Sequence, residues 1–378
     1  MGAQISALHS PIIMEIANSK ERIKELEAQI KKMPYHKGTE HHIGRLKAKI
    51  AKLKDEIIQK SGGKGGGGGR GFAVRKHGDA TVVLVGMPSV GKSTLLNKLT
   101  NANSKVGAYD FTTLDVIPGM MDYNGAKIQI FDVPGMISGA STGKGGGKEI
   151  LSVVRVADLL IFIAPANNIK GFETMEKELT EAGVRINQKK PDVSIEKRLK
   201  GGLEIIGNSG LSEETIKTLA SEFRIPNAKI TFREKVNTDE LIDAFMPNRA
   251  YVSIIKAVSK IDLLSPTKQE QLVKELSTDY VCFSSAKEIG LEKLRRKIWG
   301  KLGLFRIYLR HGPEAEPEKQ PLICEKGITV LGAAQKISEE LAREIKGAKI
   351  IGPSSRHKNQ LVGPNHKLED TDQIFFVK

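Results

Sequence analysis

One short segment of the sequence combines glycines, a lysine and a serine in an order suited to holding phosphate. Residues 86–93 read Gly-Met-Pro-Ser-Val-Gly-Lys-Ser and fit the phosphate-binding loop pattern G-x-x-x-x-G-K-[ST]. In such a loop backbone amides curl around a phosphate, and the N-terminus of the following helix favours the anion. Lys92 would bridge the β- and γ-phosphates, and the hydroxyl of Ser93 would ligate Mg²⁺. The predicted loop contributes Gly86, Pro88, Ser89, Val90, Gly91, Lys92, Ser93 and Thr94.

A second element, Asp132-Val133-Pro134-Gly135, follows the apolar run Ile128–Phe131. Asp132 can hold Mg²⁺ through a water, and the amide of Gly135 can sense a γ-phosphate. Between the two elements lie Thr112 and Thr113, one of which would close onto Mg²⁺ in the triphosphate state; we assign Thr113 and keep Thr112 as the alternative. The predicted catalytic residues are thus Lys92, Thr113 and Gly135, and the predicted Mg²⁺ ligands are Ser93, Thr113 and Asp132.

Two later elements have the chemistry to read a guanine base. After the strand-like run Tyr251–Val258 stands Ser259-Lys260-Ile261-Asp262. The carboxylate of Asp262 can accept hydrogen bonds from N1–H and the 2-amino group of guanine, which adenine cannot match. Lys260 would lay its alkyl stem across the base, and the backbone of Ser285, Ala286 and Lys287 would contact the guanine oxygen. This order of elements predicts GTP and GDP as ligands, and Asp262 opposes the weaker reading of an ATPase.

These elements must be positioned by an α/β domain. The β-branched run Ala80–Val85 predicts a buried strand before the loop, and Leu95–Leu99 predicts a helix after it. More residues lie between Asp132 and Asp262 than a compact GTPase needs, so an inserted α/β subdomain is predicted. Its predicted parts are helices at 172–182 and 211–223, the latter with Ser212 as N-cap, strands at 184–187 and 228–232, and a loop that gathers Lys189, Lys190, Lys197, Arg198 and Lys200.

The two ends of the chain carry different patterns. Apolar residues at helical spacing over 12–33 and 39–60, separated by Pro34 and Gly38, predict a helical hairpin. Its many lysines are explained equally well by a solvated face and by an arm that lies on RNA. A glycine-rich stretch at 61–71 predicts a linker. At the other end, strands at 304–310, 321–324, 348–351 and 373–377 around one helix at 329–345 predict a β-grasp module.

The overall composition indicates which classes of partner to expect. The chain has 378 residues and a formal net charge of +15, which favours a polyanionic partner such as RNA. Aromatic residues make up only 5%, so an extended base-stacking platform is not expected. No apolar run approaches the ~20 residues that cross a bilayer, and no secretory leader is evident, so a cytoplasmic protein with no membrane partner is expected. Cys282 and Cys324 are expected to be buried free thiols.

The quoted motifs, together with Tyr109–Gly119, Asp132–Ala157 and the C-terminal segment, closely resemble the developmentally regulated GTP-binding protein family within the Obg-related GTPases. The resemblance covers essentially the whole chain. It implies an α/β P-loop GTPase domain with an inserted small α/β subdomain, an N-terminal helical hairpin and a C-terminal β-grasp (TGS) domain. It also implies association with ribosomes and translation, and a dedicated regulatory partner protein. The expected boundaries are 1–60 for the hairpin, 61–79 for the linker, 80–170 and 249–302 for the GTPase domain, 171–248 for the insertion and 303–378 for the TGS domain.

Two residues depart from the expected pattern. Ser259 stands where the family usually has an asparagine that braces the loop and reaches guanine N7. Met136 stands where many GTPases carry a glutamine that orients water, and methionine cannot do this through hydrogen bonds. Slow hydrolysis is therefore expected, with a partner or a cation supplying what is missing; a potassium ion near Ser89 is one candidate, by analogy with related GTPases. The alternative function is a nucleotide-sensing RNA- or ribosome-binding adaptor with vestigial hydrolysis.

Overall fold

The computed structural model describes residues 11–61, 78–100, 117–133, 153–246, 248–276 and 279–378. Thr112, Thr113, Gly135 and Met136 lie outside the described residues, as does the glycine-rich stretch 62–71. The chain divides into two compact units. The first holds the N-terminal helices and residues 170–253, and the second holds the main nucleotide motifs and the C-terminal module.

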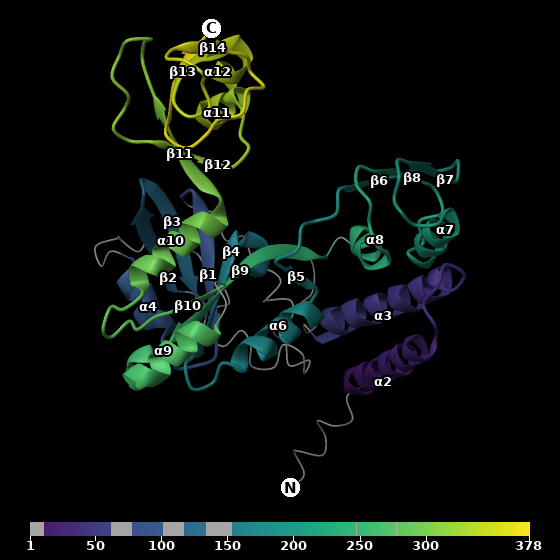
Figure 1. The fold of residues 1–378 in the computed structure, drawn as a ribbon. Helices are drawn as coiled ribbons and strands as arrows, with labels where there is room; N and C mark the ends of the chain where they lie inside the picture. The colour runs from purple at the N-terminus through teal and green to yellow at the C-terminus, as the bar shows by residue number, and fades with distance from the viewer. Residues whose placement is uncertain (1–10, 62–77, 101–116, 134–152, 247, 277–278) are drawn as a thin grey trace. The chain divides into compact units, whose positions relative to one another are not determined.

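The largest sheet has the order β10-β9-β4-β1-β3-β2, with β5 paired to β9 (Figure 1). Strand β1 runs parallel to β3 and to β4, so that Leu84 lies opposite Asp132 and Gly86 lies opposite Ile163. Every residue of β1 is buried, which explains its continuous apolar sequence. The strands are β1 Ala80–Gly86, β2 Ile117–Tyr123, β3 Ala126–Asp132, β4 Leu159–Pro165, β5 Val184–Ile186, β9 Ala250–Ser259 and β10 Tyr280–Cys282.

Helices pack on this sheet through a few apolar side chains each. α4 (Lys92–Leu99) begins at Gly91, whose φ of 98° is left-handed, and it buries Leu95, Leu96 and Leu99. α10 (Leu291–Leu302) buries an apolar stripe in the same core, whereas α9 (Pro266–Glu275) buries no residue. Two further helices are α6 Gly171–Glu181, which follows β4 in the chain, and the short 3-10 helix η2 Ile261–Leu263, which follows β9. The predicted P-loop GTPase fold is confirmed.

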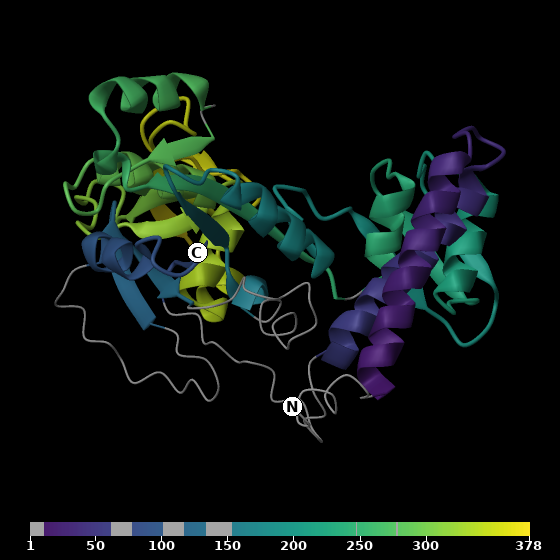
Figure 2. The ribbon, with the colours of Figure 1, turned by 90° about the horizontal axis from the view of Figure 1, so that it is seen from below.

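The helical hairpin at the N-terminus is confirmed and is not a free arm. Helices α2 (Pro11–Lys32) and α3 (Glu40–Ser61) pack through Ile23, Leu26, Leu46 and Ile50. The other side of α3 packs on the inserted subdomain, because Ala48 belongs to that subdomain's core (Figures 1 and 2). Gly44 is close to α8, since a Cβ there would lie 3.1 Å from Thr238 Cγ2. Part of the hairpin surface is thus committed to packing.

The inserted subdomain contains more elements than the sequence suggested. Its sheet has the order β6-β8-β7 and is covered by α7 and α8. Ser212 is the N-cap of α7 as predicted, and its side chain accepts from Thr215 N at 3.2 Å. The elements are β6 Val193–Lys197, β7 Leu203–Ile206, α7 Glu213–Glu222, β8 Ala228–Phe232 and α8 Thr238–Phe245.

One expectation about this subdomain is wrong. The five basic residues do not share one loop, because Lys189 and Lys190 precede β6, Lys197 ends it, and Arg198 and Lys200 follow it. The strand predicted at 184–187 is present as β5, and it pairs with the first residues of β9. The short strands β6 and β7 lack the long β-branched runs that make a strand visible in a sequence.

The C-terminal module has a five-stranded sheet of order β12-β11-β15-β13-β14 and confirms the TGS-type β-grasp fold. The single helix predicted at 329–345 is wrong: Ser338 separates two helices, because its backbone is extended and its side chain caps the second by accepting from Leu341 N at 3.0 Å. The elements are β11 Leu304–Leu309, β12 Leu322–Glu325, α11 Val330–Ile337, α12 Glu339–Glu344, β13 Gly347–Ile351, β14 Gln360–Val362 and β15 Asp372–Val377.

The two cysteines are free, with Cys324 buried and Cys282 half-buried. Burial raises the pKa of the Cys324 thiol to about 11, so this thiol stays protonated and unreactive at neutral pH. Among the helices that the structure describes, none combines the length and apolar character that a membrane crossing requires.

Candidate nucleotide site

The carboxyl ends of the central strands bring the predicted motifs to one edge of the sheet. Because β1 and β3 are parallel, Gly86 and Asp132 end their strands at the same edge. The carbonyl of Ser259 at the end of β9 accepts from Ala166 N, just after β4, at 3.0 Å. Strand β10 runs parallel to β9, with Cys282 opposite Val258. Ligands in open α/β sheets bind beyond the carboxyl ends of the strands, so this edge is the expected place for a nucleotide.

The phosphate-binding loop is tightly folded around its own lysine. A Cβ at Gly86 would lie 2.6 Å from Ile163 O, so only glycine fits there. Ser89 has a left-handed φ of 61°, as part of the curl of the loop. Lys92 is only 7% exposed, and its Nζ donates to Gly86 O at 3.0 Å and to Met87 O at 3.2 Å. Burial lowers the pKa of Lys92, and the nearby Asp132 carboxylate partly offsets this. A phosphate at the loop would supply the negative charge that this buried ammonium lacks.

The predicted metal ligands meet at the end of β3. Ser93 Oγ donates to Asp132 Oδ2 at 2.5 Å, and the Asp132 side chain is 2% exposed. The other carboxylate oxygen, Asp132 Oδ1, is buried and has no hydrogen-bond partner among the described residues. A buried oxygen without a partner is costly, and a hydroxyl next to a carboxylate is the kind of oxygen pair that Mg²⁺ takes. Ser93 and Asp132 therefore fit a magnesium ion, with the latter able to act through a water.

The predicted base-reading loop is attached directly to the phosphate-binding loop. Ser259 is 2% exposed, and its hydroxyl donates to Val90 O at 2.8 Å. The next residue, Lys260, has a left-handed φ of 60° and donates from Nζ to Ser89 O at 2.8 Å. Two consecutive side chains thus hold the two loops together. The sequence motifs alone did not reveal this clamp, because its acceptors are backbone carbonyls that any residue carries.

The other residues predicted to read the base lie in η2 and in the turn after β10. Asp262 lies half-exposed in the 3-10 helix η2, next to the buried Ile261. Ser284 Oγ accepts from Lys287 N at 3.1 Å and so shapes the turn that contains Ser285, Ala286 and Lys287. Ser285 Oγ is buried without a hydrogen-bond partner in the described part of the chain. A second buried polar atom is therefore left unsatisfied at this edge of the sheet.

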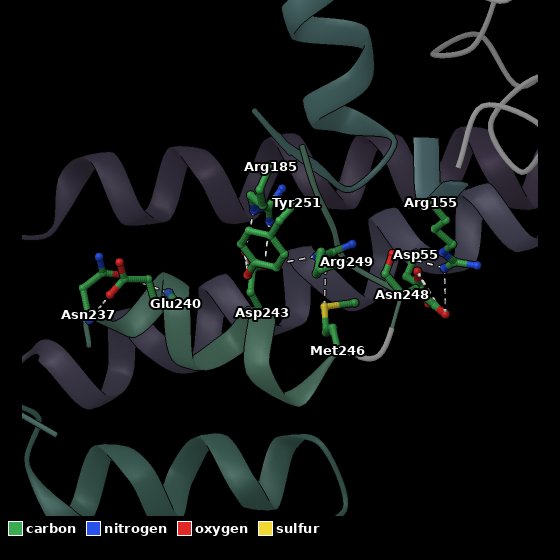
Figure 3. A network of polar contacts seen from close by, with 10 residues as sticks. All are labelled: Asp55, Arg155, Arg185, Asn237, Glu240, Asp243, Met246, Asn248, Arg249 and Tyr251. Carbon is green, nitrogen blue, oxygen red and sulfur yellow. Dashed lines mark hydrogen bonds and ion pairs between the residues drawn. The ribbon is translucent and has the colours of Figure 1, made fainter. Parts of the chain in front are cut away.

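In the first unit, a cluster of charged side chains anchors the beginning of β9 (Figure 3). The carboxylate of Asp243 accepts from Arg185 Nη2 at 2.6 Å and from Arg249 Nε at 3.1 Å, and the hydroxyl of Tyr251 lies 3.5 Å away. Burial raises the pKa of Tyr251 to about 12. Burial, and then the like charge of Arg185, lower the pKa of Arg249. These contacts join β5, α8 and the first residues of β9.

Neighbouring Asn248 extends the same cluster. Its side chain lies 3.3 Å from Asp55 Oδ2 on α3, and Arg155 Nη2 donates to its carbonyl at 3.4 Å (Figure 3). Sequence patterns do not predict this arrangement, because its members come from four separate segments.

Comparisons with known proteins match the chain along nearly its whole length. A family model described as a 50S ribosome-binding GTPase matches residues 81–197, a model of the C-terminal region of that domain matches 200–304, and a TGS domain model matches 305–378. An uncharacterized GTP-binding protein of Halobacterium salinarum is 44% identical over 94% of this chain and 98% of its own length.

Two relatives with descriptive names match a similar share of the chain. Developmentally-regulated G-protein 3 of Arabidopsis thaliana is 40% identical over 95% of this chain and 98% of its own length. Developmentally-regulated GTP-binding protein 1 of Xenopus laevis is 39% identical over 94% and 98%. These matches cover nearly the whole chain, so the chain belongs to the developmentally regulated GTP-binding protein family of Obg-related GTPases.

Proposed function

We propose that the chain is a switch that binds GTP with Mg²⁺, hydrolyses it slowly to GDP and phosphate, and acts on ribosomes. The observation that carries the proposal is the convergence at one sheet edge of the buried Lys92, the Ser93–Asp132 pair and the base-reading loop held by Ser259. These groups supply contacts for the phosphates, the metal and the base of a single nucleotide.

In this mechanism the chain contributes positioning and charge. The loop amides and the N-terminus of α4 would bind the β-phosphate, and Lys92 would stabilise negative charge that develops on the transferred phosphoryl group. Mg²⁺, when bound at Ser93 and Asp132, would neutralise charge on the phosphate oxygens. Thr113 and Gly135 keep their predicted roles on the γ-phosphate side. Met136 offers no hydrogen bond to the attacking water, which is the reason for proposing a slow intrinsic rate.

The ribosomal part of the proposal rests on three supports. The family model that matches residues 81–197 describes a 50S ribosome-binding GTPase. The net charge of +15 favours a polyanionic partner, and the chain ends in a TGS module. A dedicated regulatory protein that raises the rate, and a cytoplasmic location, belong to the same proposal. The adaptor with vestigial hydrolysis is the second candidate, favoured by Met136 and Ser259.

A GTP turnover assay and a ribosome pelleting assay test the hydrolysis and the ribosomal part of the proposal. We expect multiple turnover of GTP to be measurable, to require Mg²⁺, and to rise when K⁺ replaces Na⁺. We also expect the protein to pellet with ribosomes in a non-hydrolysable GTP analogue and to be released in GDP at moderate salt. Pelleting that ignores the nucleotide and disappears steeply with salt would indicate only phosphate electrostatics and contradict the switch. Nucleotide-dependent pelleting without turnover would favour the adaptor, and a rate indifferent to K⁺ would remove the potassium ion.

A prediction about base recognition arises from the clamp at Ser259. Its single hydroxyl proton is used on Val90 O, so no donor remains there for guanine N7. We expect the wild type to bind GTP and 7-deaza-GTP with affinities within about twofold of each other. Ser259→Asn should then prefer GTP by about three- to tenfold, because one added hydrogen bond contributes ~0.5–1.5 kcal/mol. Competition against a fluorescent guanine nucleotide measures both ratios.

The control is Ser259→Ala, which removes the clamp and offers the base nothing. It should weaken both nucleotides by a similar factor while the ratio between them stays near one. A wild type that strongly prefers GTP over the deaza analogue would show that another donor reaches N7.

A further inference from the structure

Several hydrogen bonds brace the backbone of the turn between α2 and α3. Thr39 Oγ1 accepts from His36 N at 3.2 Å and lies 2.7 Å from Pro34 O. Thr39 N and Glu40 N both donate to His36 O, at 2.9 and 3.1 Å. A backbone that is already braced loses less conformational entropy when the turn contacts a ligand.

This turn exposes an aromatic ring. Tyr35 is 70% exposed, and it is the only aromatic among the large apolar side chains that the structure describes as exposed. Tyr35 does not belong to the hairpin core, which is formed by Ile23, Leu26, Leu46 and Ile50. Its ring is therefore accessible to a partner.

Tyr35 also lines a pocket of about 350 Å³. The hairpin wall consists of Tyr35, His36, Lys37 and Glu40, and the opposite wall is Gly210, Leu211 and Ser212 before α7. That wall is held by its own hydrogen bond, from Gly210 N to Asn208 Oδ1 at 3.0 Å. The volume is at the lower end of the ~300–1,000 Å³ that ligand sites occupy. An aromatic ring, an imidazole, a leucine and a carboxylate are suited to a flat heterocycle with polar edges.

The charge around the pocket favours phosphate. Residues 28–54 contain a single acidic residue, Glu40. The basic residues of the same segment are Lys31, Lys32, Lys37, Arg45, Lys47, Lys49, Lys52 and Lys54. Those next to the turn, Lys31, Lys32 and Lys37, are exposed, and no salt bridge to any of them is found in the described part of the chain. A small pocket with an aromatic ring suits one base, and the exposed ammonium groups beside it suit the phosphates of a flexible single strand.

We propose that this pocket binds an unstacked base of single-stranded RNA, with Tyr35 stacking on the base and Lys31, Lys32 and Lys37 contacting the flanking phosphates. A duplex would offer the lysines its phosphates but could not place a base against the ring. An acidic protein surface would use the lysines and leave the pocket unexplained. The inference specifies the RNA partner of the proposed function at a surface that takes no part in GTP hydrolysis.

Binding of a fluorescein-labelled 12-nucleotide single-stranded RNA of mixed sequence to the full-length protein, followed by anisotropy at several salt concentrations, tests the proposal. Tyr35→Ala should weaken binding about tenfold, because the stacking of one base on the ring is lost, and Tyr35→Phe should stay within about twofold of the wild type. Lys37→Ala should lower the salt slope by about 0.7. The matched charge control is Lys274→Ala on α9, which buries no residue and should leave binding unchanged.

The outcomes separate the alternatives. Equal affinity of wild type and Tyr35→Ala, or equal dependence on Tyr35 with a duplex of the same sequence, would overturn the proposal. Because Tyr35 is exposed, its variants should unfold at the wild-type temperature, which removes misfolding as an explanation. GTP turnover is measured on the same samples: Tyr35-dependent RNA binding without turnover would defeat the proposed GTPase and leave this inference standing, and turnover without Tyr35-dependent binding would do the reverse.

Discussion

Lys92→Ala is expected to abolish measurable GTP hydrolysis. Lys92 is only 7% exposed, and its Nζ lies within the predicted phosphate-binding loop, where negative charge would develop during transfer of a γ-phosphoryl group. Removing one such preorganised donor typically lowers the rate about 10²–10³-fold, and from a slow intrinsic rate this falls below detection. Single-turnover release of phosphate from bound GTP measures the effect on the chemical step, and nucleotide competition measures the effect on binding.

A matched control separates this effect from a general loss of charge on α4. Lys98 lies six residues further along the same helix, and its Nζ pairs with Glu288 at the exposed surface at 2.5 Å. Lys98→Ala removes an equal charge and should leave turnover within about twofold of the wild type, because exposed ion pairs contribute little. Lys92→Ala with wild-type turnover would refute the assignment of this loop as the phosphate site. Comparison of the unfolding temperatures of the two variants shows whether loop contacts to Gly86 and Met87 also support the fold.

Asp262→Asn is expected to change the preferred base from guanine to xanthine. The carboxylate would accept two hydrogen bonds from guanine, and hydrogen bonds to charged groups contribute ~1.5–3 kcal/mol each. Losing the acceptor for the 2-amino group corresponds to a fall in GTP affinity of about 10–10²-fold. An asparagine can still accept from N1–H and can donate to the oxygen at C2 of xanthine, so XTP should bind the variant better than GTP. Equilibrium competition with GTP, XTP and ATP measures the change.

The exposed Asp279 provides the control, because Asp279→Asn makes the same chemical change in the same unit without a predicted ligand. It should leave the order GTP over XTP unchanged. If Asp262→Asn kept the wild-type preference for GTP, the base would be read elsewhere, and Ser285, whose buried hydroxyl lacks a partner among the described residues, would be the next residue to substitute.

Much of this protein could be read from local sequence because local chemistry dictates it. The phosphate-binding loop needs Gly86 where a Cβ would meet Ile163 O, and it needs a left-handed residue before α4, which Gly91 supplies. The hairpin helices follow from apolar residues at a spacing of three and four, broken at Pro34. Parallel strands end at a common edge, so the order of the motifs already implied one site.

The errors have local physical causes as well. One helix was expected over 329–345 because the apolar spacing continues through Ser338, yet this side chain competes as an N-cap and starts a new helix. Strands β6 and β7 are short and half-buried, so they carry no clear pattern. The boundaries of the inserted subdomain remain predictions, and strand β5 within the predicted segment pairs with β9.

Only the tertiary structure decided what joins the motifs to one another. The clamp from Ser259 to Val90 spans 169 positions and ends on a backbone carbonyl. The packing of α3 against the inserted subdomain and the pocket beside Tyr35 likewise depend on segments far apart in the chain. A sequence determines side-chain chemistry and local backbone preference, and these were sufficient to predict a GTP site. Which distant groups lie within hydrogen-bonding distance depends on the packing of the whole core, and so only the folded chain shows how that site is braced.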